Sequence, residues 1–342
     1  MLQLGAQDIA IASLCVLGAV WLRWKQWKES HPELKVERLF LYPIKGVRPL
    51  EVDTVELGEL GFLYDRRFVL VSPKEDGSHE CHLAAGSPSH QLLVPSIDFS
   101  ALTLTVTSPS GRSFTTPLRP QIDALEQATV NLHQSPVQAF DVGEEAAEFF
   151  TAETSGKETR LMFLAEEVSG AKYGRKVLGN ISDGKDSGIA FQDCASYMIA
   201  STASLSEFGK NLGRDMDIKP LRPNMLVGPA ASGQILKPWA EDFWGELRIK
   251  DAIFRLTSNC VRCISINIDY DAGKRLEGSG LPLQVLSRDR RVDIGAKYSP
   301  VFGRYGFSHD VGAKISVGDK VRITKVNKEH TVFAWPGMGT PL

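Results

Sequence analysis

The sequence predicts a mainly β protein of the α+β class, built around barrels and not around a doubly wound parallel sheet. Short runs in which apolar and polar residues alternate are separated by turn residues, helical segments are few, and strands do not alternate regularly with helices. The 342 residues are 43% hydrophobic and 23% charged. This is an ordinary globular composition, and the length allows two domains.

Charge and cysteine usage exclude two broad classes of protein. The formal net charge of −2 provides no global field that would attract DNA or RNA. Five cysteines, with one close pair at 260 and 263, do not form the spaced framework of a disulfide-stapled secreted domain. We therefore expect a reducing compartment and no nucleic-acid partner.

The N-terminus carries an apolar run from 9 to 22, which approaches the roughly 20 residues needed to cross a bilayer if it is counted from Leu2. Cations and tryptophans follow the run up to residue 28, as at a membrane–water interface. This order predicts an uncleaved anchor within residues 1–28, spanning with 2–22 and leaving the rest of the chain in the cytosol. An amphipathic or disordered tail is the alternative.

Strand-like runs begin after this segment and continue to the C-terminus. In 101–107, Leu102, Leu104 and Val106 alternate with small or polar residues, and the turn at 108–111 then predicts a hairpin with 113–118. The other predicted strands are 36–42, 67–71, 247–256, 264–269, 317–323 and 330–335.

Two segments predict helices. The first is 144–150, EEAAEFF. The second is 204–213, where Ser204 and Glu207 have the spacing of a capping box and Gly213 suits a C-terminal stop.

The segment 257–269, TSNCVRCISINID, is the most informative for chemistry because Cys260, Arg262 and Cys263 lie on a connection between two predicted strands. The sequence contains no phosphate-binding GxxxxGK[ST] loop, no GxGxxG after a strand, no HExxH and no GxSxG. Four interpretations of the cysteine pair remain open: a zinc site, a redox-active dithiol, a single thiolate that binds a soft metal, and two buried structural cysteines.

Other candidate binding residues are cations and amides near strand ends or in loops. Lys45 follows YPI, Arg66 lies in LYDRRF, and Arg222 and Asn224 flank a proline. Singly each suits a salt bridge, but together they form the donor set that a phosphate or an extended polar cofactor requires.

At these residues the chain resembles the MOSC superfamily, whose name comes from the C-terminal domain of molybdenum cofactor sulfurase, and within it the membrane-anchored branch that reduces amidoximes. The resemblance covers about residues 35 to 325 and implies an N-terminal MOSC β-barrel domain at 33–160 packed with a MOSC-type β-barrel at 175–338. It is carried by YPIKG at 42–46, LYDRRF at 63–68, SLSEF at 204–208, RPN at 222–224, AEDFW at 240–244, CVRC at 260–263, SPVFGRY at 299–305 and VGDKV at 317–321.

The resemblance implies a molybdenum ion held by a pyranopterin (molybdopterin) cofactor and by one protein thiolate. That thiolate belongs to Cys263, which is the implied catalytic residue and metal ligand. The implied cofactor-binding residues are Lys45, Arg66, Arg222, Asn224, Asn259, Arg262 and Cys263. Two departures from the family pattern bear on substrate preference: the segment 82–93, HLAAGSPSHQLL, lacks an expected Thr-x-Arg, and Gly46 stands where relatives often have Ser.

The implied activity is the reduction of N-hydroxylated substrates, such as amidoximes and hydroxylamines, by cleavage of the N–O bond. Electrons would come from a cytochrome b5-type haem protein and its flavin reductase, and the anchor would place the enzyme at the mitochondrial outer membrane or the endoplasmic reticulum. Asp193 and Asp242 are candidate proton donors. The alternatives are a sulfur-carrying MOSC protein with a persulfide on cysteine and a non-catalytic carrier of the molybdenum cofactor.

Overall fold

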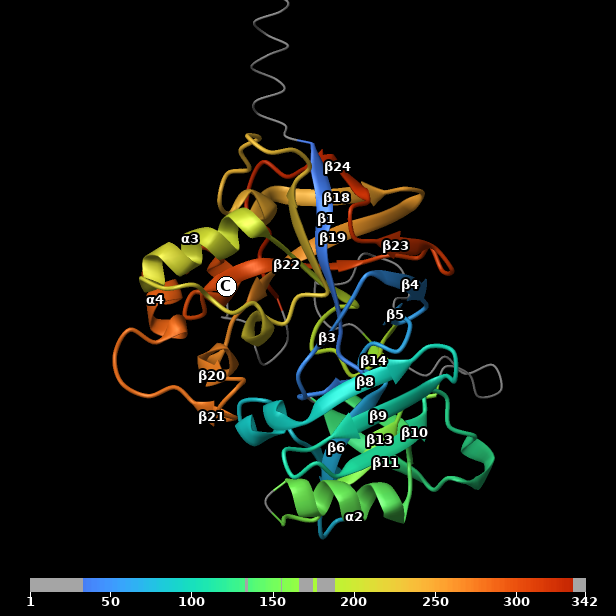
Figure 1. The fold of residues 1–342 in the computed structure, drawn as a ribbon. Helices are drawn as coiled ribbons and strands as arrows, with labels where there is room; N and C mark the ends of the chain where they lie inside the picture. Colours follow the sequence, from blue (N-terminus) through green and yellow to red (C-terminus); the bar gives the residue numbers. More distant parts are fainter. Residues whose placement is uncertain (1–32, 133–134, 155, 166–174, 177–187, 335–342) are drawn as a thin grey trace, which may run out of the picture.

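The computed structural model describes residues 33–132, 135–154, 156–165, 175–176 and 188–334. These residues form two lobes, one above the other, each built on a β-barrel (Figure 1). The predicted mainly β, α+β fold with two barrels is therefore confirmed.

The first barrel lies in the lower lobe of Figure 1 and closes because β13 pairs with both β12 and β6. Its strands are β6 (Phe68–Pro73), β7 (His79–Cys81), β11 (Gln127–Leu132), β12 (Ser135–Asp141) and β13 (Arg160–Phe163). The short β2 (Ile44–Lys45) joins the edge of β6 in parallel. A small antiparallel sheet packs beside the barrel and contains β8 (Val94–Asp98), β9 (Thr103–Thr107) and β10 (Ser113–Pro117).

The helix α2 (Glu144–Glu153) covers the far end of the first lobe and confirms the helix predicted at 144–150. Its side chains Phe149 and Phe150 are buried and pack against Phe114 of β10. The predicted hairpin is also confirmed: Leu104 and Val106 face the core of this lobe, and Leu102, which is half-exposed, lies before the strand.

The second barrel is closed by the pairing of β1 (Leu34–Leu41) with β17 (Met225–Pro229). The remaining strands are β16 (Tyr197–Ser201), β18 (Trp244–Ile249), β19 (Ala252–Val261), β22 (Val301–Phe307) and β24 (Lys320–Val326). Although β1 precedes all strands of the first barrel in sequence, it runs among the late strands of the upper lobe (Figure 1). The described part of the chain therefore starts in the second barrel, forms the first barrel and then returns to the second.

Two helices lie side by side on one flank of the second barrel, α3 (Thr202–Leu212) and α4 (Pro282–Asp289) (Figure 1). The helix predicted at 204–213 is confirmed, and Gly213 ends it in the left-handed region with φ of 69°. The predicted capping box is wrong, because Ser201 is the N-cap and its side chain accepts a hydrogen bond from the Ser204 amide. The hydroxyl of Ser204 instead donates to Glu241.

Three strand predictions need correction. The run 247–256 is a hairpin and not one strand, because the chain turns at Lys250, whose φ is 51°, between β18 and β19. The segment 264–269 forms a 3-10 turn at Ile264–Asn267 before the two-residue β20 (Ile268–Asp269). Residues 331–334 form no strand, whereas the strand predicted at 317–323 corresponds to β24.

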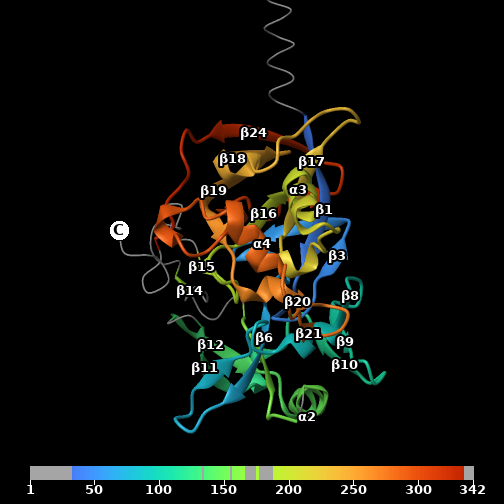
Figure 2. The same cartoon turned by 90° about the vertical axis from the view of Figure 1, so that its left-hand side faces the viewer.

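Seven further short strands pair with one another or with strands named above. They are β3 (Leu50–Val52), β4 (Thr54–Gly58), β5 (Gly61–Phe62), β14 (Arg175–Lys176), β15 (Gly188–Ile189), β21 (Lys274–Arg275) and β23 (Lys314–Ser316). The hairpin formed by β20 and β21 lies at the junction of the two lobes in both views (Figures 1 and 2).

The predicted anchor at residues 1–28 lies outside the described residues. Within the part of the chain that the structure describes, no helix is long and apolar enough to cross a membrane.

Candidate functional site

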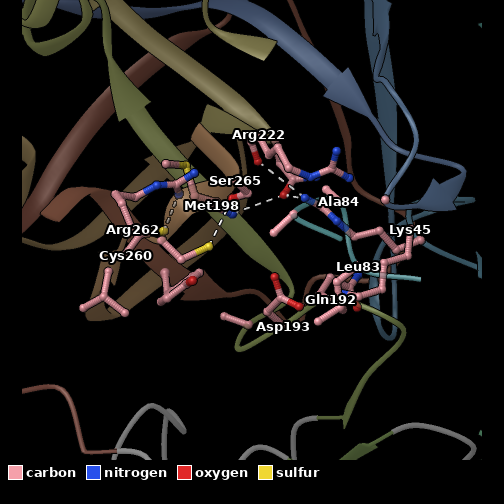
Figure 3. A pocket seen from close by; sticks show the side chains of 18 residues that line it. Lys45, Leu83, Ala84, Gln192, Asp193, Met198, Arg222, Cys260, Arg262 and Ser265 are labelled. Carbon is pink, nitrogen blue, oxygen red and sulfur yellow. Dashed lines mark hydrogen bonds and ion pairs between the residues drawn. The ribbon is translucent and has the colours of Figure 1, made fainter. Parts of the chain in front are cut away.

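An open cleft at the junction of the barrels collects side chains from both lobes (Figure 3). Six of the seven residues predicted to bind a cofactor line it: Lys45, Arg66, Arg222, Asn224, Arg262 and Cys263. The fold thus brings together residues that are more than 200 positions apart in the sequence.

Two of the cations, Arg66 and Arg222, are held against one aromatic ring. Their guanidinium carbons lie 4.2 and 4.4 Å from the centroid of the ring of Tyr42, the residue that directly follows β1. Burial raises the pKa of Tyr42 well above its ordinary value, so the phenol is neutral and donates to the carbonyl of Pro223 at 2.9 Å. Cation–π contacts of this kind favour Arg, whose planar group stacks on the ring.

Arg66 and Asn224 also share a buried carboxylate that the sequence analysis did not single out. Asp65 is 1% exposed and accepts from Arg66 Nη1 at 2.5 Å, from Asn224 Nδ2 at 3.1 Å and from the Tyr42 amide at 2.9 Å. Arg66 Nη1 donates in addition to Asn224 Oδ1 at 3.1 Å. The signal in the sequence was the acidic residue directly before the arginine in LYDRRF.

The cysteine pair divides into one buried and one exposed thiol. Cys260 is 1% exposed near the end of β19, whereas Cys263 is exposed and contacts the Ser265 hydroxyl at 3.1 Å. A 3-10 turn begins directly after Cys263, and its residue Ser265 also lines the cleft. Both cysteines line the cleft, but only the Cys263 thiol is exposed and so accessible to a ligand.

Arg262 lies between the two thiols and is 8% exposed. Its Nη1 donates to the Cys260 sulfur at 2.8 Å and its Nη2 to the Leu221 carbonyl at 2.8 Å, while its buried Nε has no acceptor among the described residues. Burial lowers the pKa of Arg262, but the neighbouring Cys260, Tyr305 and Cys263 raise it by more, so the guanidinium stays charged.

Lys45 contributes the fourth cation and lies across the cleft from Arg262 (Figure 3). Its side chain is buried at the end of β2 and forms an ion pair with Asp193, the one carboxylate among the described residues that line the cleft. Gln192, beside Asp193, donates to the Leu60 carbonyl at 3.0 Å, and its buried Oε1 has no donor among the described residues.

Asn259 is the predicted cofactor residue that does not line the cleft. Its Nδ2 donates to Asp293 at 3.0 Å and to the Thr331 carbonyl at 3.2 Å, and its Oδ1 accepts from Arg304 at 2.7 Å. The amide is fully used in holding the segment around Thr331 against the second barrel.

Asp242 is a structural residue. Its buried carboxylate accepts two hydrogen bonds from Arg290, at 2.8 and 2.6 Å, and the guanidinium carbon of Arg290 lies 4.1 Å from the centroid of the Trp239 ring. Asp242 does not line the cleft, so of the two candidate proton donors only Asp193 does.

The donor set of the cleft fits an elongated anionic ligand that carries a soft metal. Four cations face one carboxylate, and an exposed thiol lies beside them. The unpaired Arg262 Nε and Gln192 Oε1 leave one buried donor and one buried acceptor for a polar ligand. In the described residues, no group of three or more His, Cys, Asp or Glu side chains could hold a metal by itself, as a zinc site would require.

Comparison with known protein families finds two matching domains in the chain. Residues 33–155 match the MOSC N-terminal beta barrel domain, and residues 186–322 match the MOSC domain. Mitochondrial amidoxime reducing component 2 of Bos taurus is 28% identical over 313 residues, covering 86% of this chain and 87% of the relative. Mitochondrial amidoxime-reducing component 1 of Homo sapiens is 24% identical over 332 residues, covering 93% and 92%. A solved structure, the YUAD protein from Bacillus subtilis, aligns with a TM-score of 0.35 and 9% identity over 84% of this chain and 94% of that one.

Proposed function

This chain belongs to the MOSC-domain family, and from that premise we propose that it is an oxidoreductase that reduces N-hydroxylated compounds such as amidoximes and hydroxylamines. The observation that carries the proposal is the exposed thiol of Cys263 in a cleft lined by four cations. The printed names of the relatives in cattle and humans, which are amidoxime-reducing components, support the choice of substrate class.

The cofactor in this proposal is a molybdenum ion bound by a pyranopterin that carries a phosphate. When bound, it supplies the two electrons that cleave the N–O bond, and with two protons the products are an amidine, or an amine, and water. Cys263 would contribute the metal-binding thiolate, because a soft sulfur donor suits this metal and Cys260 is buried against Arg262.

The cations would bind and orient the anionic part of the cofactor. Arg66 and Arg222 are fixed on the Tyr42 ring, and Lys45 lines the same cleft. Hydrogen bonds from charged donors to phosphate are about twice as strong as neutral ones, so rigidly placed arginines suit this role. Arg262 would hold positive charge next to the thiolate of Cys263.

The electron donor and the location complete the proposal. The oxidoreductase would receive its electrons from a cytochrome b5-type haem protein and a flavin reductase, and residues 2–22 would anchor it in the mitochondrial outer membrane with its body in the cytosol. The names of the relatives, which are mitochondrial proteins, and the charge order of residues 1–28 support this location.

The test uses the full purified chain. We expect one molybdenum per chain by elemental analysis and conversion of benzamidoxime to benzamidine with a chemical reductant. Cys263→Ala should abolish both, whereas Cys81→Ala, which changes a buried cysteine of β7 outside the cleft, should keep both.

Other outcomes would identify the alternatives. Chains that contain molybdenum but convert no substrate would indicate a cofactor carrier. Sulfur that cyanide releases from Cys263, without molybdenum, would indicate a sulfur-carrying protein. Either result would contradict the proposed reductase.

A further inference from the structure

The cleft distributes its charges unevenly. The cations lie among the residues assigned above to the cofactor. The loop of the first lobe beside Lys45 contributes only Leu83, Ala84 and Ala85, here called the 83–85 wall. Building on the proposed function, we propose that the 83–85 wall recognises the substrate and selects N-hydroxylated compounds with an apolar, uncharged body.

The wall presents apolar surface to the cleft. Leu83 is 39% exposed, and the two alanines are half-buried. Figure 3 shows Leu83 and Ala84 on the side of Lys45, across the cleft from Cys260 and Arg262. A ligand between these sides would remove Leu83 from water, which is favourable for an aryl group. A carboxylate in the same place would lose hydration without a side-chain donor from the wall.

The backbone of the wall is fixed by short-range contacts. The amides of Gly86 and Ser87 donate to the Leu83 carbonyl at 2.9 and 3.0 Å, which closes a tight turn. Behind the turn, Gly46 has φ of 82°, and a Cβ at this position would lie 2.9 Å from the carbonyl oxygen of His82. Gly46 therefore permits a close approach that any other residue would disturb.

The second lobe holds the wall from across the junction. Arg275 of β21 donates through Nε to the Ala85 carbonyl at 3.0 Å, and Arg48 donates to the carbonyls of Gln91 and Tyr270. Both views place the β20–β21 hairpin at this junction (Figures 1 and 2). Because the wall is held from both sides, its apolar surface is formed before a ligand arrives, which lowers the entropic cost of binding.

Asp193, the one carboxylate among the described cleft residues, adds to the selection. Asp193 is exposed and ion-paired with Lys45, so this lysine is already engaged. A negatively charged substituent on the substrate would meet Asp193 and the uncharged wall. Like charges disfavour binding, and specificity is gained as much from such repulsion as from contact.

The test changes the charge of the wall in both directions. Leu83→Arg and Leu83→Glu are compared with Ile235→Arg, which adds the same charge at a residue that is 76% exposed and lies outside the cleft. The probes are benzamidoxime and 4-carboxybenzamidoxime. Dissociation constants are measured by calorimetry, and kcat/KM is measured with a chemical reductant.

We expect the unmodified protein to bind benzamidoxime more tightly than its carboxylate. Leu83→Arg should shift the ratio of the two dissociation constants about two- to fivefold toward the carboxylate, as for a partly exposed ion pair. Leu83→Glu should shift it the other way, and Ile235→Arg should leave it unchanged. Misfolding would weaken both ligands together and would not give shifts of opposite sign.

Several results would overturn the proposal: no binding of either probe, preference of the unmodified protein for the carboxylate, or ratios that do not move in opposite directions in the two Leu83 variants. The proposed reductase activity is judged separately. Shifted binding ratios without formation of benzamidine would support the wall as the ligand surface and refute the proposed reaction. Formation of benzamidine with unshifted ratios would support the reaction and refute the role of the wall.

Discussion

The two cysteines of the CVRC segment should separate stability from function when each is replaced by alanine. Cys260 is 1% exposed and accepts from Arg262 Nη1 at 2.8 Å. Its removal leaves a buried charged donor without a partner, which costs about 1–3 kcal/mol. Cys263 is exposed and its thiol contacts the Ser265 hydroxyl at 3.1 Å, so its removal should change stability by less than about 0.5 kcal/mol.

The assay pairs urea unfolding with the molybdenum content and the benzamidoxime turnover of each purified variant. We expect Cys263→Ala to unfold like the unmodified protein and to lose both molybdenum and turnover. Cys260→Ala should unfold at lower urea and, where folded, keep most of its activity. Cys260→Ser, which restores an acceptor for Arg262, should recover part of the lost stability. A stable but inactive Cys260→Ala together with an active Cys263→Ala would refute the assignment.

Four further predictions concern the cleft, the core and the N-terminus. Arg222→Ala should weaken cofactor binding by about 1.5–3 kcal/mol, seen as molybdenum content about ten- to a hundredfold lower at limiting cofactor; fully loaded but inactive protein would contradict this role. Arg290→Ala leaves the buried Asp242 carboxylate unpaired and should lower the free energy of unfolding by about 3–5 kcal/mol, which a near-neutral urea midpoint would disprove. Burial lowers the pKa of His90 from 6.5 to about 3, so the unfolded chain binds an extra proton below pH 6.5. The stabilisation linked to neutral His90 should be fully present above pH 6.5, and the free energy of unfolding should fall by about 1.4 kcal/mol per pH unit toward pH 3. The fall should be less steep in His90→Gln, and equal slopes in the two proteins would contradict this. Deletion of 1–28 should release the protein from membranes and keep its turnover with a chemical reductant, and a truncated protein that stays in the membrane fraction would refute the anchor.

Much of the cleft could be predicted because its residues occur in short motifs with recognisable chemistry. Lys45, Arg66, Arg222 and Cys263 were all singled out from their local neighbourhoods, and the structure brings them to one cleft. The family resemblance implies that Asn259 flanks the thiolate, but in β19 the pairing with β22 is irregular between Asn259 and Val261, and Asn259 does not line the cleft. Its amide consequently binds Asp293 and Arg304 instead.

The roles of the buried carboxylates depended on distant partners. Asp65 and Asp242 are both adjacent to conspicuous motif residues, yet neither sequence position shows whether the carboxylate faces a cleft or an arginine. In the fold, Asp65 accepts from Asn224, 159 positions away, and Asp242 binds the Arg290 guanidinium 48 positions away. Burial and pairing are properties of tertiary contacts, so the sequence alone left Asp242 as a candidate proton donor.

The sequence by itself determined the mainly β class, the two α-helices at 144–150 and 204–213, and the hairpin at 101–118, because alternation, helix stops and turn residues act within a few positions of the chain. Only the tertiary structure decided that β1 closes the second barrel with β17, since strand pairing over almost 200 residues leaves no local signal. It also decided that 264–267 turns as a 3-10 helix after Cys263 and that the loop at 82–87 presents Leu83 to the cleft. These features arise where one barrel packs against the other, and the pattern within either segment does not contain that contact.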